Sequence, residues 1–206
     1  IGLAVWLLAS HVLVVRDRLR HKTSPGAFFS DLAGNGRSFY GMVLAHLGVA
    51  MFIVGATMVS NFGQEKDVRM SPGDAQEVAG YRFVFQGVGN ERGPNYIAAR
   101  GHFQVFEGDR QIAELWPEKR NYFASQKPMT EASIDWGFTR DLYVSLGEPL
   151  DGGDWALRLY YKPYVRWIWL GAVLMALGGL LAITDRRYRL ARKAATLPAG
   201  ATAIRS

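Results

Sequence analysis

The residue most able to do chemistry in this chain of 206 residues is His46, which lies inside an otherwise apolar run. The run covers residues 41–60, reads GMVLAHLGVAMFIVGATMVS, and contains no other ionisable side chain. An ionisable residue in such a segment is costly and usually faces a partner or a cavity. A neutral imidazole could hydrogen bond to another helix, relay protons, or bind a metal, including haem iron. The residues alone leave these three roles open.

Glycines share the segment with His46 at a spacing of seven residues: Gly41, Gly48 and Gly55. Seven residues are close to two helical turns, so these glycines would line one face of a helix. Such a groove could lie against a flat macrocycle or against another helix. A later apolar block also carries glycines that would permit close helix approach, namely Gly171, Gly178 and Gly179.

The other histidines are weaker candidates. His11 lies about one turn before a basic cluster, and it could pair with His46 if the helices that carry the two residues run antiparallel. His21 lies within the basic segment, where we expect it to be solvated. His102 alternates with Arg100 and Gln104, which predicts a place on the polar face of a strand. No catalytic Ser/His/Asp or paired-carboxylate spacing stands out. The chain has no cysteine, so it lacks the Cys-x-x-Cys-His motif of a c-type cytochrome.

Three apolar blocks must position these residues: 1–15, 40–60 and 165–184. A helix needs about 20 predominantly apolar residues to cross a bilayer core. The second block meets this length, and the third nearly does. The first block begins at Ile1 and is followed by Arg16-Asp-Arg, which does not fit a signal peptide. We therefore expect residues 1–15 to be the end of a truncated transmembrane helix.

The net charge of +6 is concentrated beside these blocks. Basic residues dominate 16–39 and 185–206, whereas the middle stretch is nearly neutral. Excess Lys and Arg in short flanking segments mark the cytoplasmic side. We therefore predict a cytoplasmic loop at 16–39, an exported domain at 61–164 and a basic cytoplasmic tail at 185–206. Nucleic-acid binding is disfavoured because both basic clusters directly abut the predicted spans.

The exported stretch has the pattern of β structure. The run YRFVFQGV from Tyr81 alternates in polarity, and HFQVF–EGDR–QIAELW predicts a hairpin about a Gly-Asp turn. Residues 155–161 place Trp155, Leu157, Leu159 and Tyr161 on one face. The predicted fold class is a membrane protein of α plus β type: transmembrane helices with an inserted antiparallel β domain, either a small sandwich or a barrel. Residues 116–148 mix many charges and suit either a polar binding surface or an ordinary charged exterior.

Four collinear segments carry a family resemblance: GMVLAHLGVA, EKDVRMSPGD, PEKRNYFASQKPMTEASIDWGFTRDLYVSLGE, and YYKPYVRWIWLGAVLMALGGLLA with DRRYR. They resemble the C-terminal part of the cytochrome c maturation protein F (CcmF) family over roughly residues 41–189. The paralogous haem-lyase subunits for nitrite reductase look similar. The resemblance implies a bacterial, multi-pass inner-membrane protein of a haem-lyase complex, with residues 61–164 in the periplasm.

This resemblance also implies a role for His46. In the family, the histidine of the GMVLAH helix is one of two transmembrane ligands of a b-type haem. His46 is therefore expected to be an axial ligand of haem b, with the second ligand outside this chain. The family's Trp-rich periplasmic motif lies upstream and has no counterpart here, so no catalytic residue can be assigned and the chain is not expected to be catalytic alone.

Two functions follow from these patterns. The first is the C-terminal portion of a cytochrome c haem lyase subunit, which helps to hold the haem and docks partners. Those partners would be the N-terminal part of the same protein, other haem-lyase subunits, a haem chaperone, apocytochrome c and membrane lipid, but no nucleic acid. The alternative is a membrane-anchored periplasmic β binding module that scaffolds an assembly complex without ligating haem. The two differ at His46, which an anchor alone would not need.

Overall fold

The computed structural model describes residues 1–19, 36–124 and 127–185. These residues divide into two compact units, one formed by Ile1–Val54 with Trp167–Ser206 and the other by Gly55–Arg166. Most of the predicted loop at 16–39, including His21, and nearly all of the predicted tail at 185–206 lie outside the described residues. We call the two units the helical unit and the β unit.

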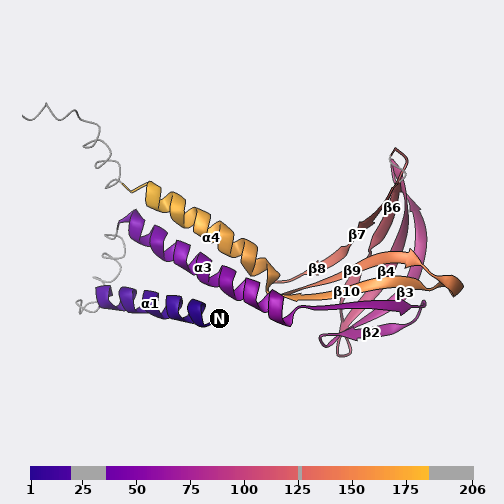
Figure 1. Cartoon of the computed structure of the whole chain (residues 1–206), viewed down its shortest axis with the longest axis horizontal. Helices are drawn as coiled ribbons and strands as arrows, with labels where there is room; N and C mark the ends of the chain where they lie inside the picture. Colours follow the sequence, from indigo (N-terminus) through magenta and orange to yellow (C-terminus); the bar gives the residue numbers. More distant parts are fainter. Residues whose placement is uncertain (20–35, 125–126, 186–206) are drawn as a thin grey trace, which may run out of the picture. The chain divides into compact units, whose positions relative to one another are not determined.

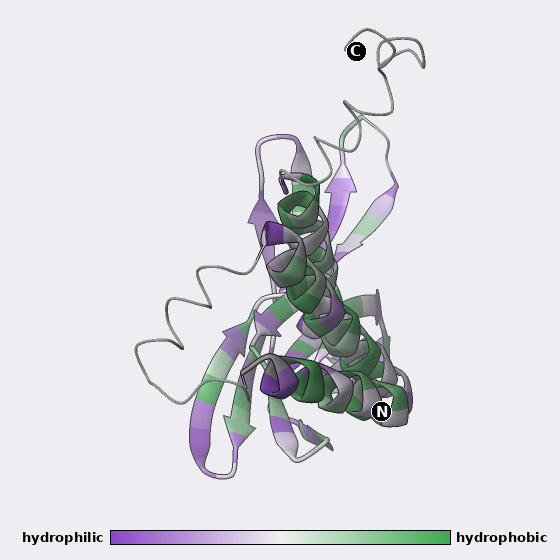
Figure 2. Cartoon of the chain, turned by 90° about the vertical axis from the view of Figure 1, so that its left-hand side faces the viewer, coloured by the Kyte–Doolittle hydropathy of each residue, from purple (hydrophilic) through white to green (hydrophobic). Residues whose placement is uncertain are grey.

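The described residues of the helical unit form three helices: α1 (Gly2–Leu19), most of α3 (Arg37–Phe62) and most of α4 (Val165–Ile183). The residues of these helices are hydrophobic on most faces (Figure 2). A helix that is apolar all round is typical of a fully buried or membrane-spanning position. Among the described residues, α3 and α4 are long and apolar enough to cross a membrane, by length and composition alone.

The glycines spaced by seven residues bring α3 and α4 into backbone contact. A Cβ atom added to Gly41 would lie 2.5 Å from the carbonyl oxygen of Gly178, and one added to Gly48 would lie 2.6 Å from that of Gly171. Residue numbers rise along α3 as they fall along α4, so the helices are antiparallel. The glycine groove predicted on α3 is therefore filled by α4. That face of α3 serves helix packing and has no room for a flat macrocycle.

Asp185 joins the ends of the same two helices. It lies two residues after the end of α4 and is only 6% exposed. Its Oδ2 accepts the Ser38 backbone N–H at 2.9 Å. The N–H groups in the first turn of a helix have no partner within the helix. A carboxylate at this position also interacts favourably with the positive end of the helix dipole. Asp185 thus caps α3 from the end of α4.

The described residues of the β unit form ten strands. Figure 1 draws the strands as arrows. They are β1 (Gln64–Met70), β2 (Ala75–Val78), β3 (Tyr81–Arg92), β4 (Tyr96–Glu107), β5 (Arg110–Leu115), β6 (Glu118–Tyr122), β7 (Pro128–Glu131), β8 (Ser133–Trp136), β9 (Arg140–Pro149) and β10 (Trp155–Pro163). A short 3₁₀ turn, Asp151–Gly153, joins the last two. One antiparallel sheet has the order β1-β10-β9-β8, and the other has β2-β3-β4-β6-β7 with β5 also paired to β4.

The core of the β unit lies between the two sheets. Phe83, Phe85 and Phe103 come from the larger sheet and are fully buried; Leu142 and Leu159 come from the smaller one. Because side chains alternate across a strand, each sheet presents one apolar face, and the two faces bury each other. The fold is therefore α plus antiparallel β, with the strands packed as a sandwich.

Two local predictions are confirmed. The hairpin predicted about the Gly-Asp turn forms β4 and β5, with Glu107 opposite Arg110. The predicted inward face of the last strand packs in or against the core through four side chains: Trp155, Leu157, Leu159 and Tyr161. Alternation of polarity was thus sufficient to place these strands.

The glycine contact yields a prediction with a control at the next residue. A Cβ at Gly178 would meet backbone atoms of α3, whereas one at Gly179 would meet nothing within 4 Å. Both changes to Ala improve helix propensity equally, so their difference reports the contact. We expect Gly178→Ala to be less stable than Gly179→Ala by about 1–3 kcal/mol, the usual cost of overpacking. Thermal unfolding of the chain in lipid nanodiscs, followed by helical circular dichroism, measures this difference. Equal midpoints would show that α3 and α4 do not meet at Gly178.

Candidate functional site

His46 is oriented by its own helix. Its Nδ1 lies 2.8 Å from the carbonyl oxygen of Met42, one turn earlier in α3. A carbonyl only accepts, so Nδ1–H donates this bond and Nε2 keeps its lone pair. Metal-binding histidines commonly donate their second ring N–H in this way, which fixes the ring and its tautomer. The hydrogen-bonding demand of the imidazole is therefore met inside α3, and the nitrogen suited to a metal is left available.

His11 of α1 lies directly beside His46. The two ring centroids are 4.5 Å apart and the ring planes are tilted by 43°. His11 Nδ1–H donates to the carbonyl oxygen of Leu7 at 2.9 Å, as His46 does to Met42. His11 was the weaker candidate from the sequence, and the structure brings it into contact with His46, the principal candidate.

The His11–His46 spacing bears on the choice of roles. A metal ion bound between two imidazoles, at about 2 Å from each nitrogen, would hold the ring centroids about 6 Å apart. The observed 4.5 Å is too short for an iron atom held between these two rings. His11 in this arrangement is therefore not the opposite axial ligand of an iron on His46. Adjacent imidazoles remain suited to proton exchange.

The surroundings of His46 limit where a haem would lie. The glycine face of α3 is closed by α4, as described above. Two apolar side chains close to His46 in sequence are partly open, with Met42 37% and Leu47 41% exposed. Haem is largely apolar, so an apolar flank beside an available Nε2 fits one of its faces. The described residues thus suit one axial ligand and one side of a pocket, but not a complete haem site.

The charge-rich segment 116–148 is spread over several strands of the β unit. It is divided among β6, β7, β8 and β9. Some of its apolar side chains, such as Leu142, lie in the core, whereas others, such as Trp136, are exposed. Its charges largely pair with one another: Arg120 Nε lies 2.7 Å from Glu118, and Arg140 pairs with Asp135. Hydrogen bonds to Tyr122 and Glu118 raise the pKa of Arg120. Most of the charges that the structure describes in this segment therefore have an ion-pair partner at the surface of the β unit.

One polar cluster in the β unit was not predicted. The ring of His102 stacks on Trp116 with centroids 3.9 Å apart and planes within 1° of parallel. The guanidinium carbon of Arg100 lies 4.9 Å from the centre of the Trp116 ring. Arg100, His102 and Trp116 line an open groove of about 620 Å³, together with Gly87 and Gly89. The sequence placed Arg100 and His102 on one strand face, but nothing in it linked them to Trp116. Among the described residues, no group of three or more His, Cys, Asp and Glu is placed to hold a metal ion.

The β unit corresponds to a domain of a known protein family. A family model described as "CcmF C-terminal beta-sandwich" matches residues 61–163, which is the β unit without its helical ends. The cytochrome c-type biogenesis protein CcmF of Pseudomonas aeruginosa is 48% identical over 193 residues, 91% of this chain and 29% of that protein. CcmF of Escherichia coli is 50% identical over 152 residues, 74% of this chain and 24% of that protein.

A second type of relative and a solved structure also match. The cytochrome c-type biogenesis protein NrfE of Haemophilus influenzae is 41% identical over 152 residues, 74% of this chain and 24% of that protein. A solved structure named "Cytochrome c Heme Lyase CcmF" superposes with a TM-score of 0.69 at 22% identity, over 89% of this chain and 29% of that one. The chain thus spans less than a third of the length of each of these proteins.

Proposed function

The chain belongs to the CcmF family of cytochrome c biogenesis proteins, and from this premise we propose that it forms the C-terminal portion of a cytochrome c haem lyase subunit. The observation that carries the proposal is the match of the whole β sandwich to the CcmF C-terminal domain. Identity to the CcmF proteins, at 48% and 50%, exceeds the 41% to NrfE, which favours CcmF over its paralogue. Covalent attachment of haem to apocytochrome c would be the activity of the complete subunit within its complex, and not of this chain alone.

We propose that α3 and α4 cross the bacterial inner membrane and carry residues 61–164 into the periplasm. The helices have 26 and 19 residues, and a rise of about 1.5 Å per residue makes each long enough to span about 30 Å of hydrocarbon. The basic residues before α3 and after α4 favour a cytoplasmic position for those ends. The antiparallel contact of α3 and α4 supports this arrangement. The first residue of α3 and the last residue of α4 then lie at the same end of the helix pair, and hence would lie on the same side of the membrane.

We propose that His46 Nε2 is an axial ligand of a b-type haem, with the second ligand supplied outside this chain. When bound, such a haem supplies one-electron transfer within the membrane. The residues of this chain hold and orient it: the Met42 carbonyl fixes the imidazole, and the contacts of Gly41 and Gly48 with α4 fix the helix that carries it. The apolar flank of α3 at Met42 and Leu47 would exclude water from a haem bound there.

The β unit would then serve as the docking surface for other haem-lyase subunits, a haem chaperone and apocytochrome c. Its paired surface charges and its groove at Trp116 suit recognition more than catalysis. A second candidate function is a membrane-anchored scaffold with this docking role alone. The prepared Nε2 of His46 favours the first function, because an anchoring helix has no use for an oriented imidazole.

The first test is topological and uses the absence of cysteine from the chain. Single cysteines are introduced at Asp109, in the turn between β4 and β5, and at Arg192. We expect an impermeant maleimide to label Asp109→Cys from the periplasm and Arg192→Cys only after the inner membrane is opened. Labelling of Asp109→Cys only from the cytoplasm would reverse the proposed topology.

The second test removes the proposed ligand in the complete assembly. We expect His46→Ala to lose most of the b-type haem, because an axial ligand is missing from the iron. His11→Ala is the matched control: its side chain touches His46 but is not assigned to the iron, so the haem should remain. Oxidised and reduced optical spectra measure haem directly, apart from cytochrome c output. An unchanged reduced spectrum in His46→Ala would refute the ligand assignment.

The third test concerns the 206 residues alone. The short His11–His46 spacing and the placement of the second ligand elsewhere predict that the purified chain does not form a six-coordinate haem. Addition of the upstream part of the protein should restore a low-spin, six-coordinate spectrum. A stable bis-histidine haem in the isolated chain would show that both ligands are already present.

A further inference from the structure

We propose that the turn between β8 and β9 dips into the lipid bilayer surface beside the start of α4 and holds the β unit against the membrane. We call Trp136, Gly137 and Phe138 the aromatic tip. Its ligand is the boundary between lipid headgroups and acyl chains. The inference rests on the proposed role of α4 as a membrane span and adds a third membrane contact to α3 and α4.

The aromatic tip is the first observation. Trp136 is 70% exposed and Phe138 is 64% exposed, two residues apart. Ile134, two residues before Trp136 on β8, adds a further 43% exposed apolar side chain. Adjacent exposed apolar residues of this size mark an interaction site more often than an ordinary surface. Trp is enriched where one end of the side chain meets hydrocarbon and the other meets water.

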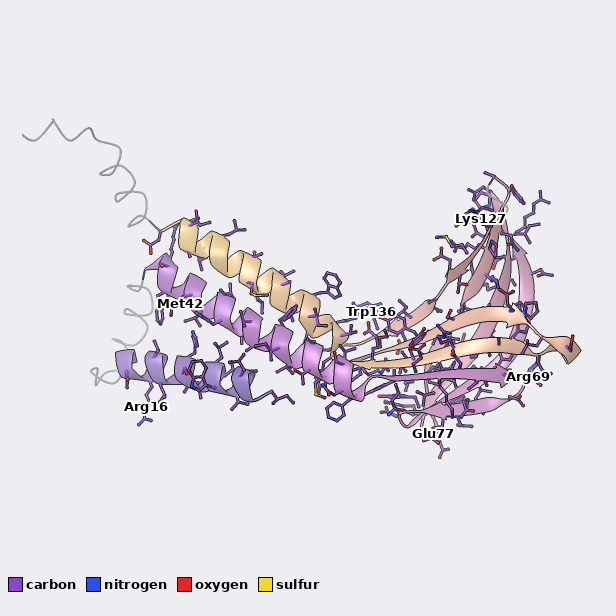
Figure 3. All side chains as sticks on the ribbon, in the orientation of Figure 1. Arg16, Met42, Arg69, Glu77, Lys127 and Trp136 are labelled. Carbon is purple, nitrogen blue, oxygen red and sulfur yellow. The ribbon has the colours of Figure 1, made fainter. Side chains whose placement is uncertain are left out.

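The second observation is the place of the tip within the β unit. The Tyr164 backbone N–H donates to the Thr139 carbonyl oxygen at 2.8 Å, and Tyr164 immediately precedes α4. The guanidinium of Arg166, in the first turn of α4, lies 4.8 Å from the centre of the Trp136 ring. Figure 3 labels Trp136 at this position and Lys127 at a distant end of the same unit. If α4 enters the bilayer at Val165, the aromatic tip lies at the same level.

The third observation is that the turn is held rigidly. Asp141 is 3% exposed and its Oδ1 accepts both the Gly137 N–H at 3.2 Å and Arg166 Nε at 3.0 Å. Arg140 pairs with Asp135 across the base of the turn. A preformed turn loses little conformational freedom on binding, so more of the burial energy is retained. The ion pair also ties the turn directly to α4.

Charge supports lipid as the occupant. The side chain of Arg166 remains 43% exposed although it contacts Asp141, so its remaining N–H groups can reach a phosphate. Guanidinium groups bind phosphate oxygens through paired hydrogen bonds. Exposed aromatic rings with a guanidinium at the start of an apolar helix match the order of acyl chain and phosphate in a bilayer leaflet. A bilayer surface requires the aromatic tip to lie level with the start of α4, as it does here, whereas a protein partner would not require that placement.

The experiment places one nitroxide spin label at a time on the chain alone in nanodiscs, so that no protein partner is present. The label sites are Phe138→Cys in the aromatic tip, Lys127→Cys as the aqueous reference and Leu177→Cys in α4 as the bilayer reference. Relative accessibility to oxygen and to a water-soluble nickel chelate reports depth. We expect the Phe138 label to be shifted from the Lys127 value toward the Leu177 value.

Two outcomes separate this inference from the proposed function. If the Leu177 label is in the bilayer but the Phe138 label matches Lys127, the aromatic tip is aqueous and the inference is wrong, whereas the span stands. If the Leu177 label is itself aqueous, the proposed span fails and the inference fails with it.

A second variant tests the cause of immersion. With the label on Thr139→Cys, the double change Trp136→Ser and Phe138→Ser should move the label toward the aqueous value. Met129→Ser is the matched control, since Met129 is 54% exposed on β7 of the same unit, and it should leave the label unchanged. The Thr139 label could instead report the same depth in the double variant as in the chain with Trp136 and Phe138 intact. That result would show that the aromatic side chains do not hold the turn at the bilayer, and would overturn the proposal.

Discussion

The backbone contact between α3 and α4 is the constraint on which the rest of the structure depends. At Gly41–Gly178 and Gly48–Gly171 the helices approach so closely that a single methyl group would meet backbone atoms. Without a hydrophobic driving force in lipid, such packing is a principal source of helix association. The contact fixes which face of α3 is covered. It therefore leaves His46 on a different flank, where His11 contacts it and Met42 orients it.

The same pair of helices bounds the β unit in sequence. One residue, Gly63, separates α3 from β1, and one residue, Tyr164, separates β10 from α4, so both connections to the helices are short. Asp141 illustrates how the polar interior of the β unit serves this connection. Its carboxylate is almost completely buried, and Arg166 balances its charge from the first turn of α4. Loss of Arg166 would leave the buried Asp141 carboxylate without its ion-pair partner, and an unbalanced buried charge is destabilising.

The sequence could predict what depends on periodicity but not what depends on tertiary contact. Alternating polarity identified β3, the β4–β5 hairpin and the inward face of β10, because one buried face imposes a period of two. The apolar lengths of α3 and α4 were equally direct. The Asp185–Ser38 hydrogen bond joins residues 147 positions apart, and no local pattern encodes such a cap.

The candidate site shows the same division. His46 was identifiable because an ionisable side chain in an apolar run is an exception, and the resemblance to CcmF gave it a role. A His11–His46 pair was possible from the sequence, because the loop at 16–39 lets the first two helices run antiparallel. The sequence could not establish the contact, since a period identifies the face of a helix but not the helix that packs there. The stack of His102 on Trp116 was missed for the same reason. The glycine groove was recognised, but its occupant was settled only by the structure.

The central claim is that this chain contributes one of the two nitrogen ligands to a membrane haem. The most direct measurement is pulsed electron paramagnetic resonance of the ferric haem in an assembly where only this chain carries ¹⁵N-labelled histidine. The account predicts one strongly coupled ¹⁵N ligand nitrogen opposite one unlabelled ¹⁴N ligand, and loss of the ¹⁵N coupling when His46 is replaced. A haem with two ¹⁴N ligands, or with two ¹⁵N ligands, would contradict it.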